Sequence, residues 1–275
     1  MKFQNILFKK ENGIATVVLN RPEASNTINL DMKDELIKAI QKVSQDDKTR
    51  VLVVTGAGRT FCAGGDFRPS KVRAKEIAVK DAEDMAPAYD SVRQGNVLPD
   101  VIELTLALQR LGKPTIAMVN GAAVGQGFDL ALACDIRIGS PQSRFMMGFV
   151  RMGLPPATGG AWLLPRVVGL GKALQYIFTG DWCDAQEAYR IGLLNELVPA
   201  EHLLEETMKL GNRIAAGPPI ALRLSKQEVY RAQETDLESS LAFATACSFI
   251  AAASDDHKEG IEALAERRSP VFKGR

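Results

Sequence analysis

The first half of the chain alternates short apolar stretches with segments whose apolar residues recur at helical spacing. Residues 3–9 and 14–19 predict two strands, and the Asn12-Gly13 pair between them is typical of a tight hairpin turn. Residues 30–46 predict an amphipathic helix, with Asn29 as its N-cap. The chain is therefore expected to begin with a hairpin that leads into a helix.

Continuous apolar runs at residues 51–55 and 114–119 predict strands that are buried on both faces. Residues 101–111 and 127–134 predict helices, and residues 135–139 predict a further strand. Alternation of apolar strands with helices implies a parallel sheet covered by helices, and such sheets bind ligands at the carboxyl ends of their strands. This half of the chain therefore predicts an α/β fold with a ligand crevice at that edge.

After residue 158 the pattern becomes almost entirely helical. We expect a core of residues 1–200 and a helical C-terminal region of residues 201–275, which caps the core or packs on other subunits. Residues 68–98 are the least regular segment and are rich in charge, so we expect helical pieces in a mobile loop over the crevice. The helices expected in the second half are 159–167, 170–178, 184–191, 200–215, 218–232, 236–251 and 255–265.

Two glycine-rich segments, Gly56–Gly65 and Gly121–Gly127, follow the ends of predicted strands. We therefore expect the two loops to lie near one crevice. In the first segment, the adjacent Gly64 and Gly65 let backbone N–H groups face a ligand without obstruction by side chains. A simple tight turn is the alternative interpretation of that pair.

The second segment continues into Gly125–Ala133, where glycines open a helix that follows a buried strand. Free N–H groups at a helix start carry partial positive charge and suit an oxyanion or a phosphate. The segment has neither the Gly-Lys-Ser/Thr of a P-loop nor the GxGxxG dinucleotide pattern. A donor that faces a developing enolate oxygen is therefore the better chemical interpretation.

Composition excludes several classes of function. With 34 basic and 33 acidic residues the net charge is +1, so the chain lacks the basic footprint of a nucleic-acid binder. The four cysteines form no CxxC pair, which argues against a disulfide framework and predicts no metal site. No long apolar run and no leader pattern is present, so we expect no membrane span and a cytoplasmic location. The two histidines, His202 and His257, are interpreted as solvated surface residues rather than catalytic groups.

A series of short motifs runs along the chain: Leu19–Ala24, Phe61–Asp66, Lys113–Gly121, Cys134–Ile138, Gly153–Pro156, Gly159-Gly160, Phe178–Gly180 and Arg268–Arg275. In this order, and over nearly the full length, they resemble the crotonase (enoyl-CoA hydratase/isomerase) family. The resemblance implies a crotonase (ClpP-like) fold of stacked ββα turns with a helical C-terminal region. It also implies an acyl-CoA substrate, no cofactor apart from the coenzyme A of that substrate, and assembly as a homotrimer or a dimer of trimers.

The resemblance further assigns roles to individual residues. In the family, two backbone N–H groups form the oxyanion hole, and the matching positions here are Gly65 and Gln126. The second is usually glycine, but a backbone donor tolerates a side chain if φ stays negative. By the same resemblance, the coenzyme A nucleotide is expected along Arg21, Glu23, Ala24, Ala63, Gly64 and Asp66, and near Phe272 and Lys273 of a C-terminus.

The type of reaction depends on which acidic residues are present. Hydratases of the family carry one acid three residues after the second donor, which is Asp129 here, and a second acid at a position occupied by Phe149. The acid of some ring and dienoyl isomerases is also missing, because Ala157 takes its place. An acid in the first turn of a helix is also favourable without any catalytic role, so Asp129 has a structural alternative.

One base beside an oxyanion hole can move a proton between carbons, whereas water addition normally uses a pair of acids. Phe149 and its methionine neighbours are expected to keep that side of the site dry and could raise the pKa of Asp129. The sequence thus favours isomerisation, or hydration with an unusual arrangement. Hydrolysis or decarboxylation of an acyl-CoA on the same fold, and a crotonase-fold binding protein with little activity, remain as alternatives. Further acids could come from the charged segment, at Asp81, Glu83, Asp84 or Asp90, with Tyr89 as another donor.

Overall fold

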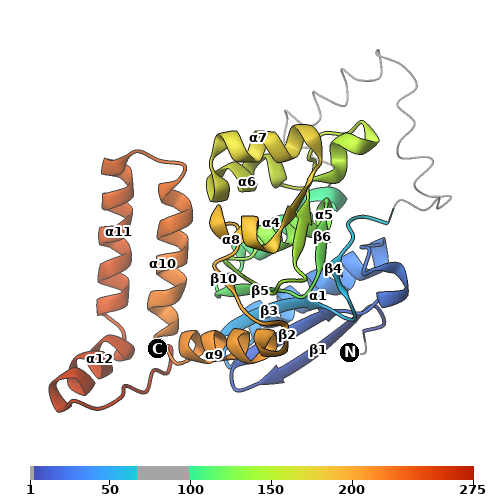
Figure 1. Ribbon diagram of the computed structural model, residues 1–275. Helices are drawn as coiled ribbons and strands as arrows, with labels where there is room; N and C mark the ends of the chain where they lie inside the picture. The colour runs from blue at the N-terminus through green and yellow to red at the C-terminus, as the bar shows by residue number, and fades with distance from the viewer. Residues whose placement is uncertain (1–2, 67–98) are drawn as a thin grey trace.

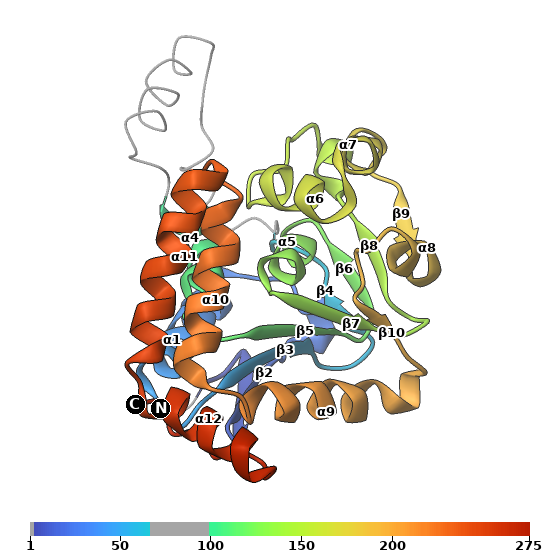
Figure 2. The same ribbon diagram turned by 90° about the vertical axis from the view of Figure 1, so that its left-hand side faces the viewer.

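The structure is a computed structural model that describes residues 3–66 and 99–275. The predicted loop of residues 68–98, with its possible acids, lies outside the described residues. The α/β fold with a helical C-terminal part is confirmed, and Figures 1 and 2 show the sheets at the centre with helices on either side.

The larger sheet has six strands in the order β1-β2-β3-β5-β7-β10. The predicted hairpin is its edge, because β1 pairs with β2 antiparallel and Asn12 and Gly13 turn between them with positive φ. From β2 onward every pair is parallel, as the apolar runs indicated. The strands are β1 (Ile6–Glu11), β2 (Ile14–Leu19), β3 (Val51–Gly56), β5 (Thr115–Val119), β7 (Ile136–Gly139) and β10 (Glu196–Leu197).

A smaller sheet of four strands stands beside the first, in the order β4-β6-β8-β9. The sequence pattern did not predict it, since a strand of three residues is too short to show periodicity. Its first three strands pair in parallel, and β9 pairs with β8 antiparallel. The strands are β4 (Thr60–Cys62), β6 (Ala122–Val124), β8 (Arg144–Met146) and β9 (Trp182–Asp184).

Helices fill the space around and between the two sheets (Figure 1). The predicted helix after the hairpin begins where expected, and the Asn29 side chain accepts a hydrogen bond of 2.9 Å from the Met32 N–H. The fully buried Phe61, Phe128 and Phe145 belong to the main core, which joins the sheets to these helices. The elements are η1 (Pro22–Ala24), α1 (Leu30–Gln45), α4 (Pro99–Arg110), α5 (Gln126–Ala133), η3 (Gly148–Met152), α6 (Gly160–Val168), α7 (Leu170–Thr179), α8 (Ala185–Arg190), η4 (Ala200–His202) and α9 (Leu203–Ala215).

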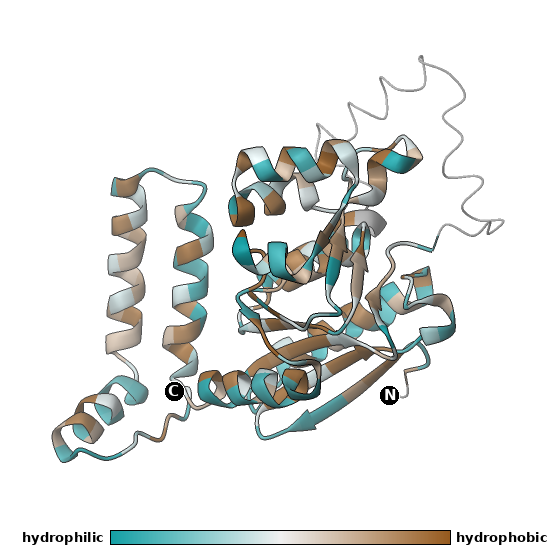
Figure 3. Ribbon diagram, in the orientation of Figure 1, coloured by the Kyte–Doolittle hydropathy of each residue, from teal (hydrophilic) through white to brown (hydrophobic). Residues whose placement is uncertain are grey.

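The last three helices stand apart from this body. Helices α10 (Pro219–Ala232) and α11 (Leu237–Ala252) form an antiparallel hairpin, and α12 (Asp255–Glu266) turns away at its foot (Figure 1). Figure 3 shows α11 apolar along much of its length. Large apolar side chains are exposed on α11 and α12: Leu237, Leu241, Phe249, Ile250, Ile261 and Leu264.

A partly buried polar cluster around Asp135 ties α10 to the sheet. The Asp135 carboxylate accepts hydrogen bonds from Lys226 Nζ at 2.9 Å and from the Tyr230 hydroxyl at 2.6 Å. It also accepts from the Thr115 backbone N–H at 2.7 Å and from the Thr115 hydroxyl. Because each partner is a strong donor to a charged acceptor, this cluster fixes the hairpin to the first residues of β5 and β7.

Within residues 3–66 and 99–275, no single helix is both long and apolar enough to cross a membrane. Helices α11 and α12, which are bent by 75° relative to each other, reach that length and composition only when they are taken together.

Candidate active site

The two glycine segments meet at β4, as the sequence predicted. Strand β4 pairs with β6, and three glycines pack against the backbone of β4 and of Arg59 directly before it. A Cβ at Gly56 would lie 2.2 Å from the Thr60 carbonyl oxygen, one at Gly121 would lie 2.0 Å from that of Arg59, and one at Gly127 would lie 2.2 Å from that of Cys62. No side chain fits at such distances, so close approach of main chains explains why these residues are glycine.

The end of the first segment lies directly against the start of the second. Gly64 has a φ of 99°, and a Cβ there would lie 2.8 Å from the Val124 carbonyl oxygen and 3.7 Å from the Gln126 nitrogen. Gly125 has a φ of 51° and turns the chain from β6 into α5. The structure thus brings Gly64, Gly65 and Gln126 into one small region.

The backbone N–H groups of Gly65 and Gln126 have no hydrogen-bond acceptor among the described residues. Ile28 N–H donates to the Gly64 carbonyl at 2.8 Å, and Asp66 N–H donates to the Ile28 carbonyl at 2.9 Å, so the intervening Gly65 N–H is turned to the other side. Gln126 is the first residue of α5, where N–H groups lack partners within the helix. Neither N–H donates a hydrogen bond to any residue that the structure describes.

The residues predicted to hold the nucleotide gather on the same side of the molecule. Arg21 pairs with Asp66 at 3.2 Å and donates to the Thr27 carbonyl at 2.6 Å. Ala63 N–H donates to the Ser25 carbonyl at 3.0 Å, which places the first segment beside η1, the helix that carries Glu23 and Ala24. These contacts bring the segment with Arg21, Glu23 and Ala24 against the segment with Ala63, Gly64 and Asp66.

Phe272 and Lys273 lie elsewhere in the chain. The Lys273 N–H donates to the Asp256 carboxylate at 2.6 Å, and the Phe272 ring lies near Gly260. Both contacts are with α12, and Figures 1 and 2 show the C-terminus on the side away from β4. Within one chain these two residues do not join the site, so their predicted role requires the C-terminus of another copy.

Asp129 projects from the first turn of α5 and is fully buried. Its Oδ2 accepts a short hydrogen bond from the Thr158 hydroxyl. Its Oδ1 lies so close to Gly160, the first residue of α6, that a Cβ there would approach it to 2.5 Å. The Gly160 amide favours the charged form of the carboxyl, but Oδ1 has no well-formed hydrogen bond to a described residue.

Burial controls the protonation of this carboxyl. Loss of hydration raises the pKa of Asp129 to about 7, and the Thr158 hydroxyl and the Gly160 amide only partly oppose that rise. No charged side chain is among the causes of the shift. A carboxyl that exchanges its proton near neutral pH can both accept and return a proton, which is the property required of a general acid–base.

Apolar side chains surround the position where hydratases of the family carry a second acid. The Phe149 ring lies against Gly125, within about 3.6 Å of a Cβ there, and is almost fully buried on η3. Met147 is completely buried and contacts Gly160 from the other side. Ala157 is exposed and offers no polar group. The dry surroundings expected from these residues agree with the raised pKa of Asp129.

The sequence did not predict that Thr158 and Gly160 lie against Asp129. Thr158 is buried next to Asp129, and a threonine directly before the Gly159-Gly160 pair was the available signal. By contrast, the interpretation of Cys62 as a packing residue is supported, because burial raises the pKa of its thiol to about 12. His202 and His257 are exposed, as expected.

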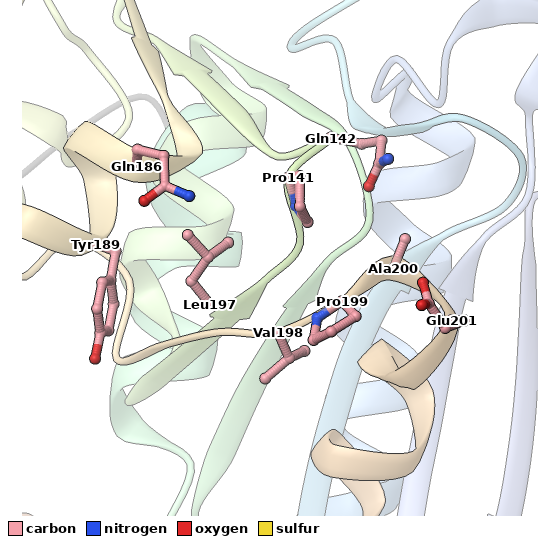
Figure 4. Close-up of a pocket in the computed structure, with 9 residues that line it drawn as sticks. All are labelled: Pro141, Gln142, Gln186, Tyr189, Leu197, Val198, Pro199, Ala200 and Glu201. Carbon is pink, nitrogen blue, oxygen red and sulfur yellow. The ribbon is translucent and has the colours of Figure 1, made fainter.

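Two cavities lie away from these residues. One of about 500 Å³ is bounded by the turn between β7 and β8, by α8 and by the chain that follows β10, with Gln142, Gln186 and Tyr189 at its rim (Figure 4). The other, of about 440 Å³, lies between α10 and the core and is lined by Asp135 and Tyr230 among others. No predicted site residue lines either cavity, so the candidate site remains the junction of β4 and α5.

Comparison with known proteins gives one consistent result. The family described as enoyl-CoA hydratase/isomerase matches residues 9–275. The chain is 34% identical over 273 residues to a crotonyl-CoA hydratase of Syntrophomonas wolfei, covering 99% of each chain. It is 36% identical over 270 residues to a 1,2-epoxyphenylacetyl-CoA isomerase of Escherichia coli, covering 98% of each. Among solved structures, an enoyl-CoA hydratase from Bacillus anthracis superposes with a TM-score of 0.84 at 31% identity, over 99% of this chain and 100% of the other.

Proposed function

Because the chain belongs to the enoyl-CoA hydratase/isomerase family, we propose that it moves a proton between carbons of an unsaturated acyl-CoA through a thioester enolate. It is an enzyme of the hydratase/isomerase kind, with the crotonase fold. In the proposed mechanism, Gly65 and Gln126 stabilise the enolate oxygen and Asp129 transfers the proton. The observation that carries the proposal is Asp129, the one fully buried carboxyl of the described part of the chain, with a pKa near 7, in the first turn of the helix that Gln126 begins.

The enolate oxygen is proposed to sit between the N–H groups of Gly65 and Gln126. Both groups lack a described acceptor, and Gln126 adds the positive end of the α5 helix dipole. Donors that are already oriented before the reaction stabilise a charge that forms in the transition state, typically by about 3–4 kcal/mol for each donor. The close contact of Gly64 with Val124 and Gln126 fixes the separation of the two loops, and therefore of the two donors.

Asp129 is proposed to remove a proton from one carbon and to return it to another. Its pKa of about 7 leaves a substantial fraction of each protonation state near neutral pH. The carboxyl has no exposed surface, so an acyl chain must displace a neighbouring side chain to reach it. Phe149 and Met147 are the apolar neighbours on that side, and both would shield the reaction from water.

This arrangement favours isomerisation over hydration. Water addition requires one group to activate water and another to protonate carbon, and Phe149 and Ala157 occupy the two positions where a second acid was sought. A relative named as a crotonyl-CoA hydratase and one named as an epoxyphenylacetyl-CoA isomerase match the chain about equally well, so identity alone does not separate the two reactions.

The acyl-CoA is proposed to lie with its nucleotide along Arg21, Glu23, Ala24, Ala63, Gly64 and Asp66, and no cofactor beyond this coenzyme A is proposed. Two contacts that link these residues support the proposal: Arg21 pairs with Asp66, and Ala63 N–H donates to the carbonyl of Ser25, which follows Ala24. Self-association, as a homotrimer or a dimer of trimers, is proposed through the exposed apolar faces of α11 and α12. It would also bring the Phe272 and Lys273 of one copy towards the nucleotide of another.

The test is to incubate crotonyl-CoA and a 3-enoyl-CoA in D₂O with the wild-type protein and with Asp129→Asn, and to follow the products by mass spectrometry. We expect deuterium incorporation or double-bond migration without water addition, reduced about 10²–10⁴-fold in the variant. A water adduct that disappears in Asp129→Asn would make the enzyme a hydratase with the same acid–base. Free coenzyme A or CO₂ would instead indicate hydrolysis or decarboxylation.

A substitution at Phe149 sharpens the choice between the two reactions. Phe149→Glu places a second carboxyl opposite Gly125 and should introduce measurable water addition, whereas Phe149→Leu, which keeps an apolar wall, should not. Unchanged activity in Asp129→Asn would exclude Asp129 as the acid–base and overturn the proposed mechanism.

A further inference from the structure

Thr158 is the one side chain among the described residues that is hydrogen-bonded to Asp129. Its hydroxyl donates to Oδ2, whereas Oδ1 has no well-formed hydrogen bond. The two oxygens of the same carboxyl therefore differ: Oδ2 accepts a hydrogen bond from a side chain, whereas Oδ1, equally buried and next to Gly160, has no side-chain partner among the described residues.

The loop that carries Thr158 is itself held in place. The Thr105 hydroxyl of α4 donates to the Thr158 carbonyl oxygen at 2.6 Å. Gly159, with a φ of 121°, passes so close to Thr105 that a Cβ there would lie 3.0 Å from its methyl carbon. Gly160 then lies against both Asp129 Oδ1 and Met147. Two hydroxyl contacts and two glycines thus fix Thr158 relative to Asp129 from the side of α4.

We propose that Thr158 is the positioning residue for Asp129: it holds Oδ2, so that the transferred proton is taken up and released at Oδ1. The inference rests on the proposed role of Asp129 as acid–base. When a substrate C–H bond breaks, its proton forms an O–H bond at Oδ1 and its electron pair enters the enolate. The O–H bond then breaks as a new C–H bond forms at the other carbon, so no external donor is needed.

A hydroxyl suits this role better than a charged partner. It donates to Oδ2 of the carboxylate, and it can go on donating to the same oxygen when the proton is bound at Oδ1, so the contact persists in both protonation states. A lysine or arginine would instead hold Asp129 permanently charged and prevent it from keeping the proton. Among the described residues no charged side chain shifts the pKa of this carboxyl, although α4, α6, β4 and β6 all pack on α5. Its neighbours are Gly160 of α6 and Thr158, and Met147 lies against Gly160.

The test compares Thr158→Val, which keeps the shape and removes the hydroxyl, with Thr158→Ser, which keeps the hydroxyl. Proton exchange between the acyl-CoA and D₂O gives kcat and KM across pH. The hydrogen bond favours the charged form, so its loss should raise the pKa of Asp129 and move the acidic limb of the kcat/KM profile to higher pH by about one unit. We expect kcat to fall about tenfold or more in the valine variant with KM within twofold, and serine to restore most of the activity.

Thr207→Val is the matched control, because Thr207 is a fully buried threonine of α9 whose hydroxyl has no described partner. It should leave kcat, KM and the pH profile unchanged. Thr105→Val should shift the profile in the same direction as Thr158→Val, but less. Should Thr158→Val melt well below the wild type, Thr158→Ala, which also lacks the hydroxyl, replaces it in the comparison.

The outcomes separate this inference from the proposed function. If the hydroxyl-free variants keep the wild-type pH profile and kcat while Asp129→Asn is inactive, the positioning role is wrong and the acid–base role stands. If serine fails to restore activity that valine lost, the contribution of Thr158 is packing and the inference is likewise overturned. If Asp129→Asn is fully active, the proposed function itself fails.

Discussion

The junction of β4 with α5 and the hairpin of α10 with α11 are built in opposite ways. At the junction, main chains touch main chains, glycines admit the contact, and the one carboxyl is enclosed. In the hairpin, side chains make the contacts, one polar cluster joins it to the sheet, and large apolar groups such as Phe249 remain 74% exposed. The difference indicates that small changes at the junction should affect folding and chemistry together, whereas changes on the hairpin should affect assembly.

The largest effect should come from adding one methyl group at the junction. Gly127→Ala places a Cβ 2.2 Å from the Cys62 carbonyl oxygen and 2.7 Å from the Cys62 Cβ, and both belong to a buried strand that cannot move away freely. We expect a loss of about 4 kcal/mol or more of unfolding free energy, measured by urea denaturation, together with loss of activity. Gly171→Ala on α7, which meets no heavy atom within 4 Å, should instead be neutral or stabilising by up to about 1 kcal/mol. A well-folded Gly127→Ala protein would contradict the description of the junction as closed.

The second largest effect should be a pH dependence of the unfolding free energy that comes from Asp129. The pKa of Asp129 is raised from 3.8 in an unfolded chain to about 7 in the folded state, so between these values the unfolded state ionises more readily. Stability should therefore fall as pH rises from about 4 to 7, by up to about 4 kcal/mol. Asp129→Asn should remove this dependence and unfold at higher urea concentration than the wild type at pH 8. If Asp129→Asn were less stable than the wild type at pH 8, the buried Asp129 carboxylate would not destabilise the folded state as we expect.

A moderate effect is expected where the hairpin joins the core. Tyr230→Phe removes the 2.6 Å hydrogen bond to Asp135 and leaves Lys226 and Thr115 to hold the carboxylate. We expect a loss of about 2 kcal/mol and weaker amide protection in α10, measured by hydrogen exchange. Tyr189→Phe, at an exposed tyrosine of α8, should change stability by less than about 0.5 kcal/mol. Equal effects of the two substitutions would show that the Asp135 cluster does not anchor the hairpin.

The smallest effect on the isolated fold should come from the exposed face of α11. Phe249→Ser should change unfolding free energy by less than about 0.5 kcal/mol, since the side chain is mostly exposed. If α11 is an assembly face, the same change should shift the protein towards smaller species in analytical ultracentrifugation. Phe178→Ser on α7, which is 69% exposed, is the control that should leave the assembly unchanged. A similar shift with both variants would show that assembly does not depend specifically on α11.

Much of the fold could be predicted from the sequence, because its signals are local. The Asn12-Gly13 turn, the Asn29 cap and the fully buried β3 each follow from a few neighbouring residues, and the structure confirms all three. The four-stranded sheet escaped prediction because its strands have only three residues each and are defined by pairing across the chain.

Part of the candidate site could likewise be predicted from local sequence signals, and part could not. The meeting of the two glycine loops could be predicted, since loops that follow parallel strands share one edge. The contact of Thr158 with Asp129 could not, because it joins residues 29 positions apart and depends on how Gly159 and Gly160 turn the chain. The enclosure of Asp129 was only hinted at by the methionines and Phe149 of the following segment.

The three glycines around β4 limit which substitutions the protein can tolerate during evolution. A catalytic side chain can be lost by many substitutions and regained by a few, but Gly56, Gly121 and Gly127 each border a carbonyl oxygen that no Cβ can approach. In a library of all single substitutions, the deepest intolerance should therefore map to these three glycines rather than to Gln126, whose proposed contribution comes from its backbone. A lineage carrying this fold could exchange its acids and its acyl specificity while inheriting the backbone of the junction almost unaltered.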